Sequence, residues 1–174
     1  MLKIPKGTPT EKDILGFNLR LARERTLEIL EEIKKSRGLG KDVLTARPTG
    51  GDCIGVLLCR IVALEWDVVN RLHKIVKKPS IPGEEVWPLF LGDNPPTDAI
   101  PDPDVIFSAM DEIRAHLIDV LRSSSNAIMD TVLVEKGAVP RPSLEGTARF
   151  YFIHLPQHES ALSAQIQLIN GVMK

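Results

Sequence analysis

The stretch RFYFIHLPQHESALSAQIQLINGVMK, which runs from Arg149 to Lys174, decides the fold expected of this chain. At the helical period its apolar side chains fall along one face; they are Phe150, Ile153, Ala161, Leu162, Leu168, Ile169 and Val172. His154, His158 and Gln165 fall along the same face, at spacings of four and seven residues. Because buried polar groups must find partners, a core-facing stripe that includes two imidazoles and an amide predicts a functional site here.

Three other segments carry the periodicity of bundle helices. The first begins at a hydroxyl cap, Thr10, and alternates apolar spacings of four and three; its seam is Leu15, Leu19, Ala22, Thr26, Ile29 and Ile33. The second is expected to be capped by Asp52, and its first half is apolar nearly all round, which favours a central position. The sequence predicts helices at about residues 10–36, 52–78, 103–123 and 143–173.

The segments between these helices also bear on the topology. Residues 79–103 are rich in proline, glycine and acidic residues, and Trp87, Leu89 and Phe90 are candidate anchors. A connection of this length suits a crossover better than a tight hairpin. Residues 127–135 could form a short extended or irregular piece. The expected fold is a single all-α domain, a four-helix bundle with long crossover connections.

Composition limits the possible partners. The 174 residues suffice for one domain with a full core, and the net charge of -1 gives no electrostatic footprint for nucleic acid or an anionic membrane. The longest apolar run, Cys53 to Leu64, contains Arg60 and is too short to span a bilayer. No secretory signal is visible at the start, and the two cysteines cannot bridge on one helix, so a reducing cytoplasm is expected.

The histidines are the first candidates for chemistry. His154 and His158 are four residues apart, so both rings could ligate one metal ion, or they could be a chance pair satisfied in the core. Pro156 lies between them and predicts a kink. The run His158-Glu159 begins like the H-E-x-x-H zinc helix, but Leu162 stands at the second histidine position, which excludes a protease. His73 and His116 are expected at interfaces rather than in catalysis.

Two motifs of this chain match a known pattern. The last predicted helix reads His154-x-x-x-His158-Glu159-x-x-Leu162-x-x-Gln165-Ile166. Earlier in the chain, Arg47-Pro48 leads through Asp52-Cys53-Ile54-Gly55 to Leu57-Leu58-Cys59-Arg60-Ile61. Both motifs resemble the DinB/YfiT-like proteins, whose last helix tends to read H-x-x-x-H-E-x-x-H-x-x-Q-I and whose second helix follows a proline-containing loop with S-I-G-x-L-L-x-H-L. The resemblance implies a four-helix bundle, commonly a homodimer, and in many members a divalent metal held by three histidines.

The departures from the family pattern change the expected function. Arg60 stands at the first ligand position and Leu162 at the third, so only His158 is retained, and an arginine offers no lone pair to a cation. The usual site is therefore expected to be absent, with no cofactor. Arg60, Glu65, His158 and Gln165 are expected around a cavity between the second and fourth helices, where a small anionic ligand or a partner binds.

Alternatives stay open at this point. Characterised relatives include thiol S-transferases and a maleylpyruvate isomerase, so a variant zinc or nickel site is possible, with His154, His158, an acid such as Glu65 or Glu112, and water. The Arg60 side chain has three possible roles: it extends along apolar surface, it pairs with an acidic residue, or it binds an anion. Glu65 is one candidate for the acidic partner, although an acidic residue on another helix is a better candidate. A homodimer is expected, because the first helix is apolar on two sides, at Leu15/Leu19 and Phe17/Leu21.

Overall fold

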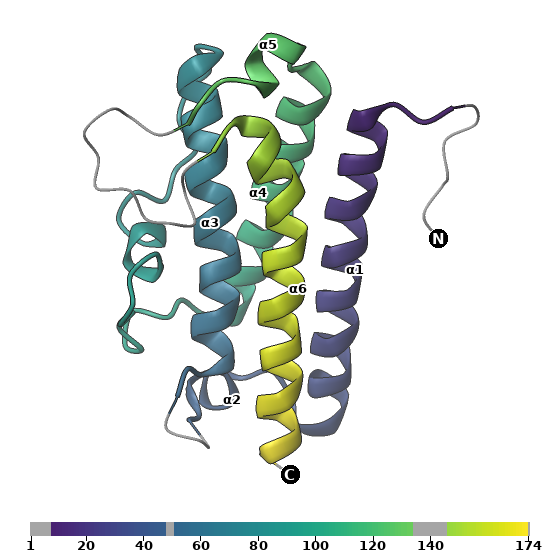
Figure 1. Ribbon diagram of the computed structural model, residues 1–174. Coiled ribbons are helices and arrows are strands. Elements are labelled where there is room, and N and C mark those ends of the chain that lie inside the picture. The colour runs from purple at the N-terminus through teal and green to yellow at the C-terminus, as the bar shows by residue number, and fades with distance from the viewer. Residues whose placement is uncertain (1–7, 48–50, 134–145, 174) are drawn as a thin grey trace.

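The computed structural model describes residues 8–47, 51–133 and 146–173 and confirms an all-α fold. Its four long helices are α1 (Glu11–Arg37), α3 (Ile54–Ile75), α4 (Pro103–Ser123) and α6 (Ala148–Val172) (Figure 1). Three short helical elements, α2 (Lys41–Thr45), η1 (Trp87–Phe90) and α5 (Asn126–Met129), lie in the connections. The predicted start of the last helix near residue 143 lies outside the described residues.

α1 begins and packs as its sequence predicts. Thr10 and Asp13 form a reciprocal capping box, in which the Thr10 side chain accepts from the Asp13 N–H and the Asp13 carboxylate accepts from the Thr10 N–H. The predicted seam is buried apart from Ile29, which is half-buried. Arg23 is buried beside this seam, which the apolar pattern did not predict.

α3 is the central helix, and most of its residues are buried. The prediction that Asp52 caps it was wrong: Cys53 is the N-cap residue and makes no side-chain cap hydrogen bond. Asp52 instead forms an ion pair with Arg60, two turns along the same helix. Cys53 and Cys59 are both free and buried, as expected of small core residues. Burial, with a smaller effect of Cys53, raises the pKa of Cys59 to about 12.

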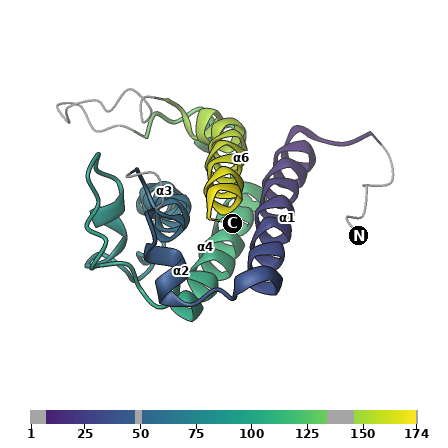
Figure 2. The same ribbon diagram turned by 90° about the horizontal axis from the view of Figure 1, so that it is seen from below.

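Contacts between the helices define the topology. α1 and α6 run in the same direction, because Arg23 pairs with Glu159 and Arg37 donates to the carbonyl of Met173 at the far end. α3 and α4 also run in the same direction, opposite to α1 and α6 (Figures 1 and 2). Two consecutive parallel helices need a long return, so the predicted crossover joins α3 to α4 and lies on the outer side of α3.

The crossover is anchored by aromatic side chains. Trp87, Phe90 and Ile100 are buried, and the indole of Trp66 on α3 donates to the carbonyl of Pro82 over 2.9 Å. Leu89, one of the predicted anchors, is 44% exposed. Gly83 has a φ of 117°, and a Cβ there would lie 2.3 Å from the Trp87 ring, so glycine is required on both counts.

The segment that follows α4, for which a short extended or irregular piece was expected at 127–135, holds a short helix and an isolated bridge up to residue 133, and residues 134 and 135 lie outside the described residues. Ser125 caps α5 by accepting from the N–H of Ile128, and Met129 turns into the core. An isolated antiparallel bridge then joins Val132 to Thr147, which caps α6. Elements of this length are stabilised by capping and packing and are too short to show a hydrophobic periodicity, so the apolar pattern of the sequence could not predict them.

The predicted core face of α6 was wrong. Ile153, Leu168 and Val172 are 42%, 71% and 58% exposed, whereas Leu162 alone of the predicted stripe is fully buried. The face that packs inward is Tyr151, Phe152, Leu155, Pro156, Glu159, Leu162, Ser163 and Ile166, with Ala148 in the first turn. The prediction failed because apolar residues occur on both sides of α6. The buried side also includes the carboxylate of Glu159, whose partners Arg23 and Arg114 come from other helices. α6 continues through Pro156.

Within the described ranges, no helix combines the length and the apolar character that crossing a bilayer requires.

Candidate functional site

Arg60 lies on the α3 side of the bundle and is engaged by protein acceptors. Its Nη1 donates to Asp52, and its Nη2 donates to the carbonyls of Gly92 and Asp93 over 3.4 and 3.3 Å. The partner is therefore neither Glu65 nor an acid from another helix, but the residue just before α3. With side chains 22% and 32% exposed, this Arg60–Asp52 pair sits at the rim of the core.

His154 and His158 lie on an exposed face of α6 instead of in the core. The His154 ring is 3.9 Å from the ring of Phe150, centre to centre. Partial burial and the nearby positive charge of Arg60 lower the pKa of His158, although a hydrogen bond to its own backbone opposes them. At neutral pH both effects favour an uncharged imidazole next to the guanidinium.

Gln165 lines a shallow groove between α3 and α6, which we call the α3–α6 groove. The groove has a volume of about 270 Å³, and its lining is Asp52, Leu57, Gln165, Leu168, Ile169 and Val172. Arg60 does not line the groove, but it forms an ion pair with Asp52, which does. Asp52 thus contacts Arg60 and lines the same groove as Gln165, and His158 lies near enough to Arg60 for the guanidinium charge to lower its pKa.

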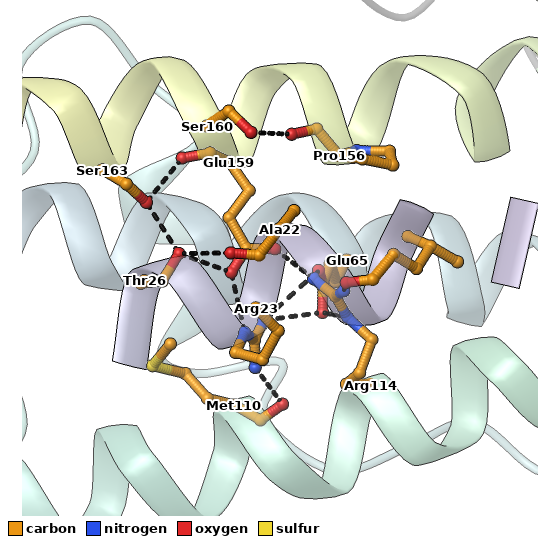
Figure 3. A network of polar contacts seen from close by, with 11 residues as sticks. Ala22, Arg23, Thr26, Glu65, Met110, Arg114, Pro156, Glu159, Ser160 and Ser163 are labelled. Atoms are coloured by element: carbon orange, nitrogen blue, oxygen red, sulfur yellow. Dashed lines mark hydrogen bonds and ion pairs between the residues drawn. The ribbon is translucent and has the colours of Figure 1, made fainter. Parts of the chain in front are cut away.

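Glu65 is separate from this groove, in the centre of the bundle. There it forms a network that we call the buried quartet, Arg23, Glu65, Arg114 and Glu159, with one residue from each long helix (Figure 3). All four side chains are 7% exposed or less. Two guanidinium groups and two carboxylates give a net charge of zero, so no unpaired charge is buried.

Hydrogen bonds satisfy the quartet on every side. Arg23 donates from Nε to Glu159 over 2.7 Å, from Nη2 to Glu65 over 3.2 Å, and from Nη1 to the Met110 carbonyl over 2.5 Å. Arg114 donates to both carboxylates and to the Leu19 carbonyl. Because each long helix supplies one charged group, a slip of any helix would strand a charge in the core.

Two hydroxyl groups extend the quartet toward the far end of α6. Thr26 donates to Glu159 over 2.9 Å, and its Oγ1 is 2.7 Å from Oγ of Ser163 (Figure 3). Ser163 also donates to the Glu159 carbonyl over 2.8 Å. The centre of the bundle is therefore filled by paired polar side chains, and Glu65 lies among them instead of lining the predicted cavity between the second and fourth helices.

The quartet predicts acid sensitivity. Burial acts to raise the pKa of Glu159, but the charges of Arg114 and Arg23 and their hydrogen bonds outweigh it and lower the pKa below 4.5. A lowered folded-state pKa contributes stability above the unfolded value, and this contribution is lost as pH falls through the folded-state pKa. We expect the urea midpoint to fall steadily below about pH 4.5.

Two variants identify the carboxylate that causes this fall of the urea midpoint at low pH, which we call the acid limb. Asp13 also has a lowered pKa, from its hydrogen bonds to Thr10, but it is on the surface. The Asp13→Asn variant should keep most of the acid limb, and Glu159→Gln should flatten it. An acid limb that is unchanged in Glu159→Gln would show that the proton is taken up elsewhere.

A second groove lies between α1 and α6 on the outer surface. This α1–α6 groove has a volume of about 420 Å³ and is lined by Ile14, Leu15, Asn18, Leu21, Ala22, Arg25, Ile153, Pro156, Gln157 and Ser160. Three of its aliphatic side chains, Ile14, Leu21 and Ile153, are 49%, 41% and 42% exposed. On the two apolar sides of α1 that led us to expect a dimer, Leu15 and Leu19 are buried, Phe17 is half-buried, and Leu21 is exposed at this groove.

Sequence reasoning missed three members of the quartet. Arg23 and Glu159 lie next to the apolar seams of their helices, and Arg114 follows Ile113 on α4, so each could have been found as a charge within a buried stripe. The predicted metal ligands remain two residues: within the ranges that the structure describes, no three or more His, Cys, Asp or Glu side chains could together hold an ion.

Comparison with known proteins adds no identification to this geometry. The chain matches no protein-family model, and no curated protein is significantly similar to it in sequence.

Proposed function

We propose that this chain is a DinB-like bundle that serves as a binding and assembly module without a three-histidine metal site, and that it pairs with a second copy through the α1–α6 groove. The observation that supports this proposal is the exposed apolar lining of that groove, at Ile14, Leu21 and Ile153. Large aliphatic side chains gathered around one concave surface gain free energy when a partner covers them.

The spacing of the groove residues favours a second copy as the partner. Ile14 and Leu15 precede Asn18 by four and three residues, and Leu21 and Ala22 follow it by three and four. A two-fold axis at Asn18 would therefore set the two apolar pairs of antiparallel α1 helices against each other, because an isologous interface exchanges residues i and j.

Charge supports the same axis. Arg25 follows Asn18 by seven residues and Glu11 precedes it by seven, so each arginine would lie opposite the Glu11 carboxylate of the other copy, which also pairs with Arg149 of its own chain. Among the described residues that line the groove, Arg25 is the one that carries a charge, and it lies at the end of the apolar run. An apolar centre with charge at the rim is the usual anatomy of a protein interface.

The two other functions expected from the sequence have less support. A small anionic ligand at Arg60 would have to displace Asp52 and two backbone carbonyls. The alternative, a zinc- or nickel-dependent transferase or isomerase built on His154 and His158, would lose Glu65 as a ligand, because that carboxylate pairs with Arg23 and Arg114. A reducing cytoplasm stays part of the proposal, since both cysteines are free.

The proposal predicts that Leu21→Glu dissociates the dimer. The substitution buries two symmetry-related carboxylates, each at a cost of roughly 1–3 kcal/mol, so the dimer dissociation constant should rise about 30-fold or more. Arg25→Glu should weaken the dimer less, by setting two acidic pairs against each other. Sedimentation velocity over a concentration series measures both effects.

Val105→Glu is the matched control. Val105 is 52% exposed on α4, away from the groove, so this variant should sediment as the wild type does. Equal dissociation constants for Leu21→Glu and Val105→Glu would place the interface on another face and contradict the proposal.

A further inference from the structure

His73 has an unusual hydrogen-bonding state at the C-terminal end of α3. Its side chain is buried, at 5% exposed, and its Nδ1 is 2.6 Å from the carbonyl oxygen of Pro79. A carbonyl oxygen only accepts, so Nδ1 carries the proton and the neutral ring presents a lone pair at Nε2. That Nε2 is buried and has no hydrogen-bond partner among the described residues. A buried polar atom without a partner requires an explanation.

The ring of His116, on α4, is the neighbour of this imidazole. The two ring centres are 5.5 Å apart, and the ring planes meet at 77°. His116 is half-buried, so this member of the pair is reached from solvent. A metal ion about 2.0–2.1 Å from a nitrogen of each ring, with tetrahedral geometry, sets ring centres roughly 5–6 Å apart.

We propose that His73 and His116 bind a divalent transition-metal ion of the zinc or nickel class, which links the end of α3 to α4. Nε2 of His73 and one ring nitrogen of His116 are the protein ligands, and water completes the coordination. The Pro79 carbonyl is the outer partner that metal-binding histidines usually have, since it fixes the tautomer and the orientation of the ring. This inference goes beyond the proposed assembly function and does not depend on it.

The charges around the pair select the kind of metal. Asp119 lies one turn beyond His116 and forms a 2.8 Å ion pair with Lys78. The hydrogen bond and charge of Lys78, with smaller effects of His116 and His73, hold the pKa of Asp119 below its usual range. Its negative charge offsets the lysine near the site. The described residues offer no third ligand, so a hard, oxygen-seeking ion such as calcium or magnesium is disfavoured and an imidazole-preferring ion is favoured.

The site is distinct from the His154–His158 pair on α6. The chain has four histidines, and the structure arranges them as these two pairs. A zinc titration of the wild type would therefore mix the two contributions. The experiment starts from full-length, untagged His154→Gln/His158→Gln protein, in which His73 and His116 are the remaining histidines.

Calorimetric titration of that variant with zinc chloride at pH 7.5 should give one equivalent bound per chain. Adding His116→Gln should weaken binding by at least about tenfold, because loss of an outer partner alone changes metal affinity by roughly 10–100-fold. Lys78→Gln should strengthen binding, since it removes a positive charge near the site. Zinc should also raise the melting temperature, because it binds the folded state.

His116→Gln is the deciding variant, because His116 is half-buried and its loss leaves the core intact, and circular dichroism verifies the fold. His73→Gln repeats the test from the buried side. The proposal is overturned if the starting variant binds no zinc, or if adding His116→Gln leaves the affinity unchanged. Zinc binding that disappears from the wild type on changing His154 and His158 alone would assign the metal to α6 and overturn it as well.

Discussion

Glu65→Leu is expected to lower the free energy of unfolding by about 3–5 kcal/mol, because it leaves two buried guanidinium groups to share one carboxylate. Glu65 accepts hydrogen bonds from both Arg23 and Arg114, and Glu159 alone cannot neutralise both. A domain of this size is stable by about 5–15 kcal/mol, so the loss is a large fraction of the total. Urea denaturation at pH 7, followed by circular dichroism, measures it.

Two controls separate burial from simple charge removal. Glu31→Leu removes one partner of an exposed pair with Lys34, whose side chains are 57% and 63% exposed, and should cost less than about 1 kcal/mol. Replacing the whole buried quartet with leucine and methionine should be neutral or stabilising by about 1–4 kcal/mol. If Glu65→Leu costs no more than Glu31→Leu, the quartet does not hold the bundle together.

Arg60→His combined with Leu162→His is expected to create a zinc or nickel site with His158. In the register that the sequence resemblance implies, these are the three ligand positions, and removing Arg60 also takes away the positive charge that opposes a cation. Its partner Asp52 is then free to act as a further ligand. At four residues before Leu162 on α6, His158 is spaced for joint ligation.

The affinity gain should be at least about tenfold over either single variant, since changes to outer partners alone shift metal affinity by roughly 10–100-fold. Calorimetry in a His116→Gln background keeps the His73 pair out of the measurement. No gain over the single variants would mean that the DinB-like register is wrong.

The helices were predictable from the sequence because their signals are local. Thr10 and Asp13 mark the start of α1, and Pro103 marks that of α4, whose predicted bounds are those observed. The crossover was predictable from its length and composition. α2 and α5 were not, since helices of four or five residues show no periodicity.

The buried quartet was less predictable, because its members are far apart in the sequence. Arg23 and Glu159 are separated by 136 positions, so the sequence could not show that a carboxylate on α6 would be neutralised in the core. Without that pairing, Glu159 counts as a surface residue and the helix is assigned the wrong inward face. The role of Asp52 was predicted wrongly for a related reason. The sequence around it is typical of a helix cap, but its carboxylate forms an ion pair with Arg60, two turns away, instead of capping α3.

The mass of the assembled wild-type protein decides whether the chain pairs with a second copy. The measurement is sedimentation equilibrium of the untagged chain in the presence of EDTA, at micromolar concentration, so that association cannot depend on a bound metal. We predict a species of twice the chain mass of 19.3 kDa. A single species at 19.3 kDa across the whole concentration range would contradict the proposed dimer.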